Sequence, residues 1–378
     1  MNSILDFVSS RKPRIVDFIG EMVECESPSG DARAIRRLAD LIGSRLKDLA
    51  RVRVFDGGSW GPHLRCDFFA ARRRRGRILA LGHLDTVWPA GTLERMPFRE
   101  KDGRLWGPGV LDMKSGIAFF AFAMRALAEL GRRPGRRVSL LLNADEEVGS
   151  PSSRPLTERE ARSSDAVLVL EPGTGLEGRL KTARKGVGGF VIEVTGRASH
   201  AGVDFAAGSS AIHELAAQVR TIIGFTRIDR GITVNVGLIS GGSRTNVVAE
   251  SARAEVDIRV PRLRDGAALE KKFHRLRPAD PRCRITVAGG LNRPPMERTA
   301  GVRRLFGVAR RLALELGVEI AESSTGGGSD GNFTAALGVP TLDGLGGVGE
   351  GAHALHESIL LDRIVDRTAL LARLVETV

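Results

Sequence analysis

Tyrosine is absent from this 378-residue sequence, and cysteine occurs only three times. Any aromatic recognition must therefore come from phenylalanine or tryptophan. The cysteines, Cys25, Cys66 and Cys283, are odd in number and far apart, without the short spacing of a zinc knuckle. We expect reduced, partly buried thiols, which excludes a disulfide-stabilised small protein.

Long apolar runs are also absent. The longest, around residues 117–124, is too short to span a bilayer. Residues 4–23 carry Asp6, Lys12 and Asp17 among their apolar residues, which suits an amphipathic helix and not the apolar segment of a signal peptide. The sequence predicts a cytoplasmic protein without a membrane partner.

The charge is predominantly of one sign, with a formal net charge of +12. Most of the excess is arginine spread along the chain, and only residues 72–75 form a compact run. Because this run lies between two apolar stretches and lacks interleaved aromatics, a solvated hairpin turn is favoured over a nucleic-acid patch. We therefore expect no nucleic-acid partner, although the positive field would favour an anionic substrate.

The length and an apolar content of 42% suffice for two domains. Between residues 64 and 170, short apolar runs alternate with helical periodicity, which predicts strands joined by helices in a mainly parallel sheet. The predicted strands cover residues 65–71, 77–81, 137–143 and 166–170, and a helix covers 117–130.

Period-two patterns then predict a smaller α+β unit of two helices on about four strands. Its predicted strands include 188–195, 233–239 and 251–260, and its helices cover 209–222 and 266–276. Two further helices, over 300–316 and 361–375, return the chain to the first unit. The predicted fold class is therefore α/β: a mainly parallel-sheet domain flanked by helices, residues 1–183 and 292–378, with an inserted α+β domain, residues 184–291.

Histidines and carboxylates follow the predicted strands of the larger domain. His83 and Asp85 stand two residues apart where a strand ends, and Asp112 lies in a glycine-rich loop before a helix. Imidazole is a good zinc ligand, and a nearby carboxylate can fix its tautomer. Taken alone, the His-x-Asp triplet is better explained by an ordinary capping role, and Asp112 is equally explained as the cap of the helix that follows it.

Acidic residues are crowded after the next apolar strand, at Asp145, Glu146 and Glu147, and Glu171 follows another. Such crowding is unfavourable unless a cation binds or one group holds a proton. Two more histidines, His353 and His356, stand in a late loop. Together these residues form the set expected for a two-metal hydrolytic centre.

These segments resemble, in order from about residue 16 to the C-terminus, the dizinc carboxypeptidase and aminoacylase family. That family includes glutamate carboxypeptidase, acetylornithine deacetylase and succinyl-diaminopimelate desuccinylase. The motifs are Gly-His-Leu-Asp at 82–85, Gly-Pro-Gly-Val-Leu-Asp at 107–112, Asp-Glu-Glu at 145–147, Ala-Ser-His-Ala-Gly at 198–202 and Thr-Gly-Gly-Gly-Ser-Asp at 325–330. The last two are closest to the glutamate carboxypeptidase branch.

The resemblance implies two Zn²⁺ ions, with Co²⁺ or Mn²⁺ as alternatives of the same ligand preference. Asp112 would bridge both ions, His83 and Glu171 would complete one, and Glu147 and His353 the other. His353 is preferred over His356 because the family's ligand usually stands four residues before a glutamate, here Glu357.

Glu146 resembles the family's general base. A carboxylate beside activated water can take its proton and pass it to the leaving nitrogen. Asp85 would orient His83. His200 of the Ala-Ser-His motif would donate to the developing oxyanion, in this family usually across the interface of a homodimer formed by the inserted domain.

For substrate binding the resemblance implies Asn246, Arg259 and Arg293, with Gly327 and Gly328 allowing close backbone approach. A guanidinium pairs well with a free carboxylate, although either arginine has local acids such as Asp257 as an alternative partner. The sequence departs from the family at residues 246–250, where a proline usually follows the two apolar residues. This departure affects the expected loop shape and hence substrate identity.

The predicted activity is metal-dependent hydrolysis of an amide bond next to a free carboxylate of a small molecule. The alternatives are an N-acyl-amino-acid deacylase and, more remotely, a non-catalytic basic binding protein suggested by the net charge alone.

Overall fold

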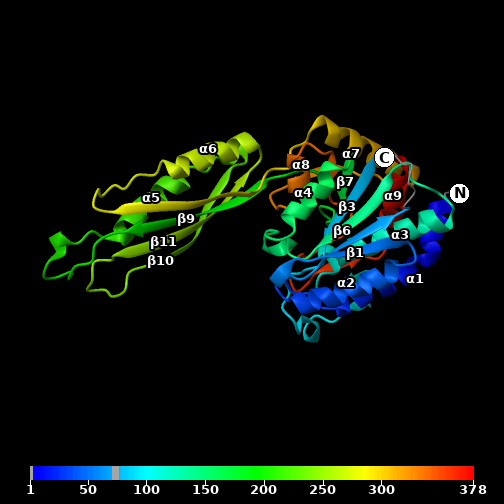
Figure 1. Ribbon diagram of the computed structural model, residues 1–378, viewed down its shortest axis with the longest axis horizontal. Helices are drawn as coiled ribbons and strands as arrows, with labels where there is room; N and C mark the ends of the chain where they lie inside the picture. The colour runs from blue at the N-terminus through cyan, green and yellow to red at the C-terminus, as the bar shows by residue number, and fades with distance from the viewer. Residues whose placement is uncertain (1–2, 70–75) are drawn as a thin grey trace. The chain divides into compact units, whose positions relative to one another are not determined.

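A computed structural model describes residues 3–69 and 76–378 of the chain (Figure 1). The chain forms two compact units. The first comprises Met1–Ala183, Arg298–Ser324 and Ser329–Val378, and the second comprises Arg184–Glu297 and Thr325–Gly328. The arginine run at residues 72–75, for which a hairpin turn is predicted, lies outside the described residues.

The main sheet of the first unit has the strand order β1-β2-β6-β3-β7-β14 within the described residues. Its strands are β1 (Ala50–Phe55), β2 (His63–Phe68), β3 (Arg77–His83), β6 (Arg137–Asn143), β7 (Ala166–Val169) and β14 (Thr341–Leu342). Strands β3, β6, β7 and β14 run parallel to one another. Strand β2 pairs antiparallel with β6, and β1 pairs antiparallel with β2. The predicted mainly parallel sheet is thus confirmed.

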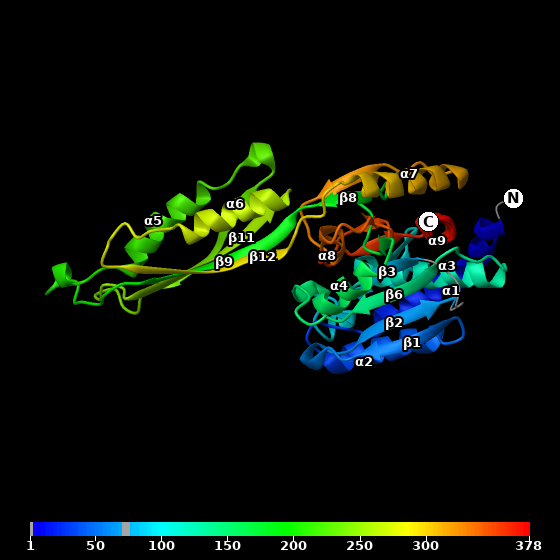
Figure 2. The same ribbon diagram turned by 45° about the horizontal axis from the view of Figure 1, so that its top comes forward.

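Helices cover both faces of this sheet (Figure 2). Every residue of β3 is buried, and successive side chains point to opposite faces. Ile78 and Ala80 join a core with α1, α2, α3, α7 and α9, whereas Leu79 and Leu81 pack with Leu156 of α4. The helices are α1 (Ser3–Glu24), α2 (Ala32–Leu46), α3 (Ser115–Glu129), α4 (Arg154–Arg162), α7 (Ala300–Glu315), α8 (Gly331–Ala336) and α9 (Arg363–Thr377).

Two small sheets complete the first unit's framework. One has the order β15-β16-β5-β4, with β4 (Arg99–Lys101), β5 (Arg104–Trp106), β15 (Gly349–Glu350) and β16 (Ser358–Leu360). It pairs Ser358 with Trp106, so two loops that are far apart in sequence become neighbours. The other pairs β8 (Leu180–Arg184) with β13 (Glu322–Thr325), and only the last residue of each strand belongs to the second unit.

The second unit is an antiparallel sheet with α5 and α6 on one face (Figure 1). Its elements are β9 (Gly186–Thr195), α5 (Ala211–Ile223), β10 (Thr233–Gly241), β11 (Ser251–Val260), α6 (Leu263–His274) and β12 (Arg284–Arg293). Alternate residues of β9 are buried, and Phe190 stacks on Phe273 of α6 with 3.9 Å between ring centroids. The predicted α+β architecture of two helices on four strands is confirmed.

No helix within residues 3–69 or 76–378 combines the length and apolarity needed to cross a membrane.

Arg367 of α9 provides a test of how the first unit holds its loops. Its fully buried guanidinium donates hydrogen bonds to the carbonyls of Gly178 (3.0 Å), Gly346 (3.1 Å) and Gly344. The Arg367→Met substitution leaves these buried acceptors unsatisfied and is expected to lower the free energy of unfolding in urea by about 3 kcal/mol. Arg310→Met, at an exposed position of α7, is the matched control and should change it by less than about 0.5 kcal/mol. Equal losses in the two variants would contradict this assignment.

Candidate active site

Polar residues meet at the carboxyl ends of the central parallel strands. His83 ends β3 and lies opposite Asn143, which ends β6, while Glu171 follows β7. Glu146 and Glu147 belong to the turn η4 (Glu146–Val148) after β6. Ligands bind at this edge in open α/β sheets because the loops there converge.

Two more residues come from loops joined by the small β15-β16-β5-β4 sheet. Asp112 lies in the turn η3 (Val110–Lys114) before α3, and His353 lies between β15 and β16. His353 has a φ of 62°, an unfavourable backbone conformation for a side chain with a Cβ, of the kind that clusters at functional sites.

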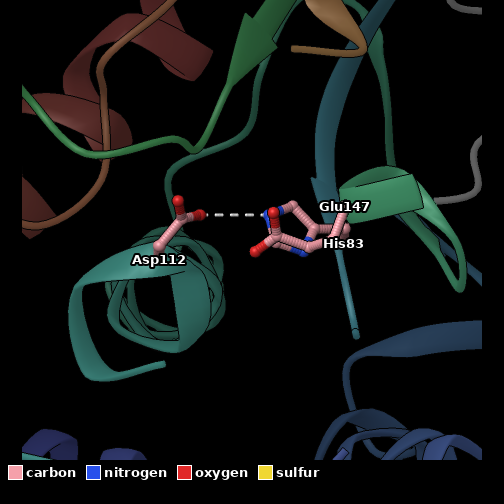
Figure 3. Close-up of side chains that lie close together, drawn as sticks. All are labelled: His83, Asp112 and Glu147. Carbon is pink, nitrogen blue, oxygen red and sulfur yellow. Dashed lines mark hydrogen bonds and ion pairs between the residues drawn. The ribbon is translucent and has the colours of Figure 1, made fainter. Parts of the chain in front are cut away.

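The carboxylate of Asp112 lies between two imidazoles. Its Oδ1 is 3.1 Å from Nε2 of His83, as Figure 3 shows, and its Oδ2 is 3.4 Å from Nε2 of His353. Glu171 Oε1 is 3.6 Å from the same nitrogen of His83, and Glu147 Oε1 is 3.4 Å from that of His353. The structure therefore gives each imidazole a second carboxylate and makes both share Asp112.

The orientation of His83 leaves one nitrogen available. Its Nδ1 lies 2.8 Å from the main-chain oxygen of Asp85, which can only accept a hydrogen bond. In the neutral ring, Nδ1 therefore carries the proton, and the lone pair of Nε2 points at carboxylate oxygens of Asp112 and Glu171. Lone pairs facing one another in this way require a positive charge between them.

The ionisation of these groups reflects the same requirement. Burial opposes protonation of His83, but hydrogen bonds with Asp112, Asp85 and Glu171 outweigh it and raise its pKa well above the usual value. Hydrogen bonds with Asp112 and Glu147 raise the pKa of His353 to about 10. Burial alone would raise the pKa of Asp112, yet its contacts with His353 and His83 hold it far below its usual range.

Divalent cations fit this cluster. His83, Asp112 and Glu147 offer ligand atoms within 4.8 Å of one another, and so do His83, Glu146 and Glu171. Two ligands of a tetrahedral zinc ion, at about 2.0–2.2 Å each, lie roughly 3.3–3.6 Å apart. The four imidazole–carboxylate distances of 3.1–3.6 Å come close to that separation. Within the described part of the chain, the contact with His353 is the one that the structure gives the buried Oε1 of Glu147.

Asp85, predicted to orient His83, does more in the structure. Its Oδ1 lies 3.5 Å from Nδ1 of His83 but accepts the backbone N–H of Glu146 at 3.1 Å. Its Oδ2 accepts the backbone N–H of Glu147 at 3.1 Å and the hydroxyl of Ser29 at 2.8 Å. The Asp85 carboxylate therefore links the strand end that carries His83 to the turn that carries both glutamates.

Glu357 is a site residue to which sequence reasoning assigned no role beyond a marker for His353. It is fully buried, and its Oε1 accepts the backbone N–H groups of Leu111 (2.9 Å) and Asp112 (3.0 Å). Its Oε2 accepts the N–H of Gly109 (3.0 Å) and the indole N–H of Trp88 (2.8 Å). Gly109 can offer its N–H from a φ of 73°, which suits glycine. The sequence offered no local signal for this role, because the partners of Glu357 lie 245 to 269 residues away along the chain.

The geometry favours His353 over its neighbour His356, since within the described residues His353 forms ion pairs with Asp112 and Glu147 and His356 forms none with the acids of the cluster. His356 is exposed.

The predicted substrate-binding residues all belong to the second unit. His200 is exposed, and its Nδ1 accepts the N–H groups of Gly202 and Val203, both at 3.2 Å. Asn246 is exposed, and its main-chain carbonyl accepts the N–H of Ala201 at 2.9 Å.

Arg259 forms a bidentate ion pair with Asp257, both hydrogen bonds being 2.9 Å long, so the local alternative for this arginine is realised. Arg293 is buried beside Gly328, where a Cβ would lie 2.8 Å from Cδ of the arginine. Sequence reasoning missed Arg184, which donates hydrogen bonds to the carbonyls of Gly327 (3.2 Å) and Gly328 (2.9 Å).

An imidazole and carboxylate cluster that fits divalent cations, at the carboxyl edge of a parallel sheet, is the kind of site that metal-dependent hydrolases use. The model of Peptidase family M20/M25/M40 matches residues 79–377, and the chain belongs to this family of metallopeptidases.

Curated relatives and a solved structure agree with this assignment. The chain is 28% identical to carboxypeptidase G2 of Pseudomonas sp. (strain RS-16), covering 99% of this chain and 91% of that protein. It is 30% identical to a putative succinyl-diaminopimelate desuccinylase of Mycobacterium tuberculosis, covering 79% of this chain and 82% of the relative. The fold matches that of YXEP from Bacillus subtilis, a dinuclear metal-binding peptidase of the same family, with a TM-score of 0.69, 13% identity, and coverage of 97% and 99%. The predicted family is confirmed.

The role of Glu357 can be tested through metal affinity. Glu357→Gln replaces an acceptor with an N–H₂ group that faces two N–H donors, so the loop that carries Asp112 should lose its fixed position. Loss of such supporting hydrogen bonds typically weakens metal binding about 10- to 100-fold. We expect the zinc affinity of Glu357→Gln to fall by this factor, as measured by competition with a chelating dye.

Trp88→Phe is the matched control, because it removes one of the four hydrogen bonds and leaves the three backbone contacts. It should weaken zinc binding less than Glu357→Gln. An unchanged zinc affinity in Glu357→Gln would show that the loop does not depend on this carboxylate.

Proposed function

We propose that this chain hydrolyses an amide bond next to a free carboxylate, as a glutamate-carboxypeptidase-like metallopeptidase with two zinc ions. The observation that carries the proposal is the placement of Asp112, whose two oxygens face two different imidazoles. A carboxylate in that position suits a bridge between two cations, and the solved structure of a relative described as dinuclear supports the same number.

In this proposal His83 and Glu171 would hold one ion, Glu147 and His353 would hold the other, and Asp112 would serve both. Co²⁺ and Mn²⁺ remain alternatives, because nitrogen and oxygen ligands accept all three metals. When bound, the cations would polarise the scissile carbonyl and lower the pKa of water at the site.

Glu146 is the proposed general base. Its backbone N–H donates a hydrogen bond to Asp85. It belongs to the same turn as Glu147, so it is the sequence neighbour of a proposed metal ligand. It takes a proton from the attacking water and delivers it to the leaving nitrogen. The substrate oxygen, which becomes negative during attack, receives a hydrogen bond from His200.

Binding of the substrate carboxylate is assigned to the arginines of the second unit. Arg293 and Arg259 lie beside the Gly326–Gly328 loop, Arg259 at 3.4 Å from the carbonyl of Gly326. A guanidinium recognises a carboxylate by two parallel hydrogen bonds, so at Arg259 the substrate would replace Asp257, which accepts both bonds in the structure. Asn246 and the backbone of Gly327 and Gly328 would complete the contacts of a small anionic substrate.

A homodimer through the inserted domain is part of the proposal. β10 lies at an edge of its sheet and exposes Leu238 and Ile239, with 64% and 61% of each residue accessible. Val203 and Phe205, just after His200, are 82% and 60% accessible. Exposed apolar side chains on a strand edge and a nearby loop suit a contact between subunits, across which His200 would serve the partner's site.

A deacylase of N-acyl amino acids is the second candidate, favoured by the similarity to a putative desuccinylase. Hydrolysis of acyl-glutamates, dipeptides and acetylornithine with added zinc, measured as released amine, separates the two. We expect the highest kcat/KM for substrates whose scissile amide adjoins a glutamate-like carboxylate. A clear preference for acetylornithine would make the deacylase the better description, and no hydrolysis of any class would contradict both.

Glu146→Gln tests the proposed base. The amide keeps the size of the side chain but cannot accept a proton, so kcat should fall by a factor of about 10² to 10⁴ while two zinc ions remain bound. Zinc content is measured by elemental analysis of the dialysed protein. Glu177→Gln, at an exposed position, is the matched control and should retain normal turnover. Normal activity of Glu146→Gln would remove the glutamate from the mechanism.

A further inference from the structure

The turn that carries Glu146 and Glu147 is held by side chains that bind its backbone. The N–H groups of Glu146 and Glu147 donate to Asp85, as described above. A further donor just before the turn, the N–H of Ala144, lies 3.1 Å from Nδ1 of His63. His63 is the first residue of β2 and is only 1% exposed.

The direction of every hydrogen bond around His63 can be assigned. Because a backbone N–H only donates, Nδ1 of His63 accepts from Ala144, and the proton of the neutral ring lies on Nε2. Nε2–H then donates to Oγ of Ser152 at 3.2 Å. The Ser152 hydroxyl donates to Oδ2 of Asp145 at 2.7 Å, and the Ser152 backbone N–H donates to the same oxygen at 2.6 Å.

This chain of hydrogen bonds ends on the residues that precede the proposed base. His63 fixes the main chain of Ala144 directly and, through Ser152, the side chain of Asp145. Asp85 fixes the main chain of Glu146 from the other side. Burial lowers the pKa of His63, which agrees with a neutral ring in this position.

We infer that His63 is a positioning residue for Glu146: it fixes the backbone from which the proposed base projects, by accepting from Ala144 and donating to Ser152. The inference rests on the proposed role of Glu146. A catalytic group has to be held in place closely, since displacement by about 1 Å can lower turnover about 100-fold.

Kinetics of the zinc-loaded enzyme test the inference with three variants. His63→Leu removes both hydrogen bonds and should lower kcat at least about tenfold, with KM and bound zinc unchanged. His63→Asn places an amide oxygen near the position of Nδ1, so it keeps the acceptor for Ala144 and should recover part of the loss. Ser152→Ala removes the hydroxyl that links His63 to Asp145, and its kcat should lie between those of the wild type and His63→Leu. His213→Asn, an exposed histidine of α5, is the control and should behave as wild type.

Two outcomes of these measurements would overturn the inference. A loss of bound zinc in proportion to kcat would place the effect on Glu147 and the metals instead of Glu146. An equal loss of kcat in His63→Leu and His63→Asn would show that the hydrogen bond accepted from Ala144 does not contribute to positioning Glu146.

A second measurement uses the wild-type protein and needs neither turnover nor a folded variant. Nitrogen-15 NMR of labelled histidines should show His63 as the neutral tautomer protonated on Nε2 between pH 6 and 8. Protonation on Nδ1, or a cationic ring in this range, would overturn the assignment. Retained activity in Glu146→Gln would instead defeat the proposed base and leave this tautomer unaffected, so the two failures can be told apart.

Discussion

The structure of the first unit depends on one electrostatic constraint: four carboxylates and two imidazoles meet where three parallel strands end. Asp112, Glu147 and Glu171 approach the two Nε2 atoms within 3.1–3.6 Å, and Glu146 lies in the same group. Like charges at this spacing repel strongly in a partly buried site. The arrangement is stable only with positive charge in its centre, which divalent cations supply more effectively than protons on the histidines.

The surrounding fold holds these groups in place through hydrogen bonds to the backbone of their loops. Glu357 gathers three backbone N–H groups of the loop that carries Asp112, and Asp85 gathers two from the turn that carries Glu146 and Glu147. Arg367 binds the carbonyl of Gly346, whose N–H in turn donates to the carbonyl of Glu171. The loops that carry the four acids are thus fixed through their backbone, so the side chains at the centre keep their lone pairs for another partner.

The sequence predicted much of the fold because its signals are local. β6 spans residues 137–143 as predicted, and β11 spans 251–260 as predicted, since runs of buried apolar residues and period-two patterns are visible within a few residues. β1 and α2 were not predicted, although α2 has apolar residues at helical spacing and Asp31 caps its N-terminus. β12 was expected only as an unplaced fourth strand, because its glycines and polar residues obscure the alternation.

The candidate site, like the fold, could be predicted from the sequence only in part. The residue types were predictable because cation ligands and bases are few, and their order along the chain resembles a known family. The residues that hold them were not, since the bonds from Glu357 to Asp112 and from His63 to Ala144 join positions 245 and 81 residues apart. Only the tertiary structure reveals such pairs, and no local pattern marks a buried histidine or glutamate as a support.

The partner of each buried acid distinguishes its function better than its place in a motif does. Asp85 stands two residues from His83, yet both of its oxygens accept backbone N–H groups, as do both oxygens of Glu357. An oxygen that already accepts such hydrogen bonds has its negative charge compensated and gains little from a cation. Asp112 and Glu147 instead direct oxygens toward imidazole nitrogens that themselves carry lone pairs when neutral. Within a few ångströms the fold thus separates acids that organise the backbone from acids that remain available to a metal, a division that the sequence motifs Gly-His-Leu-Asp and Asp-Glu-Glu do not contain.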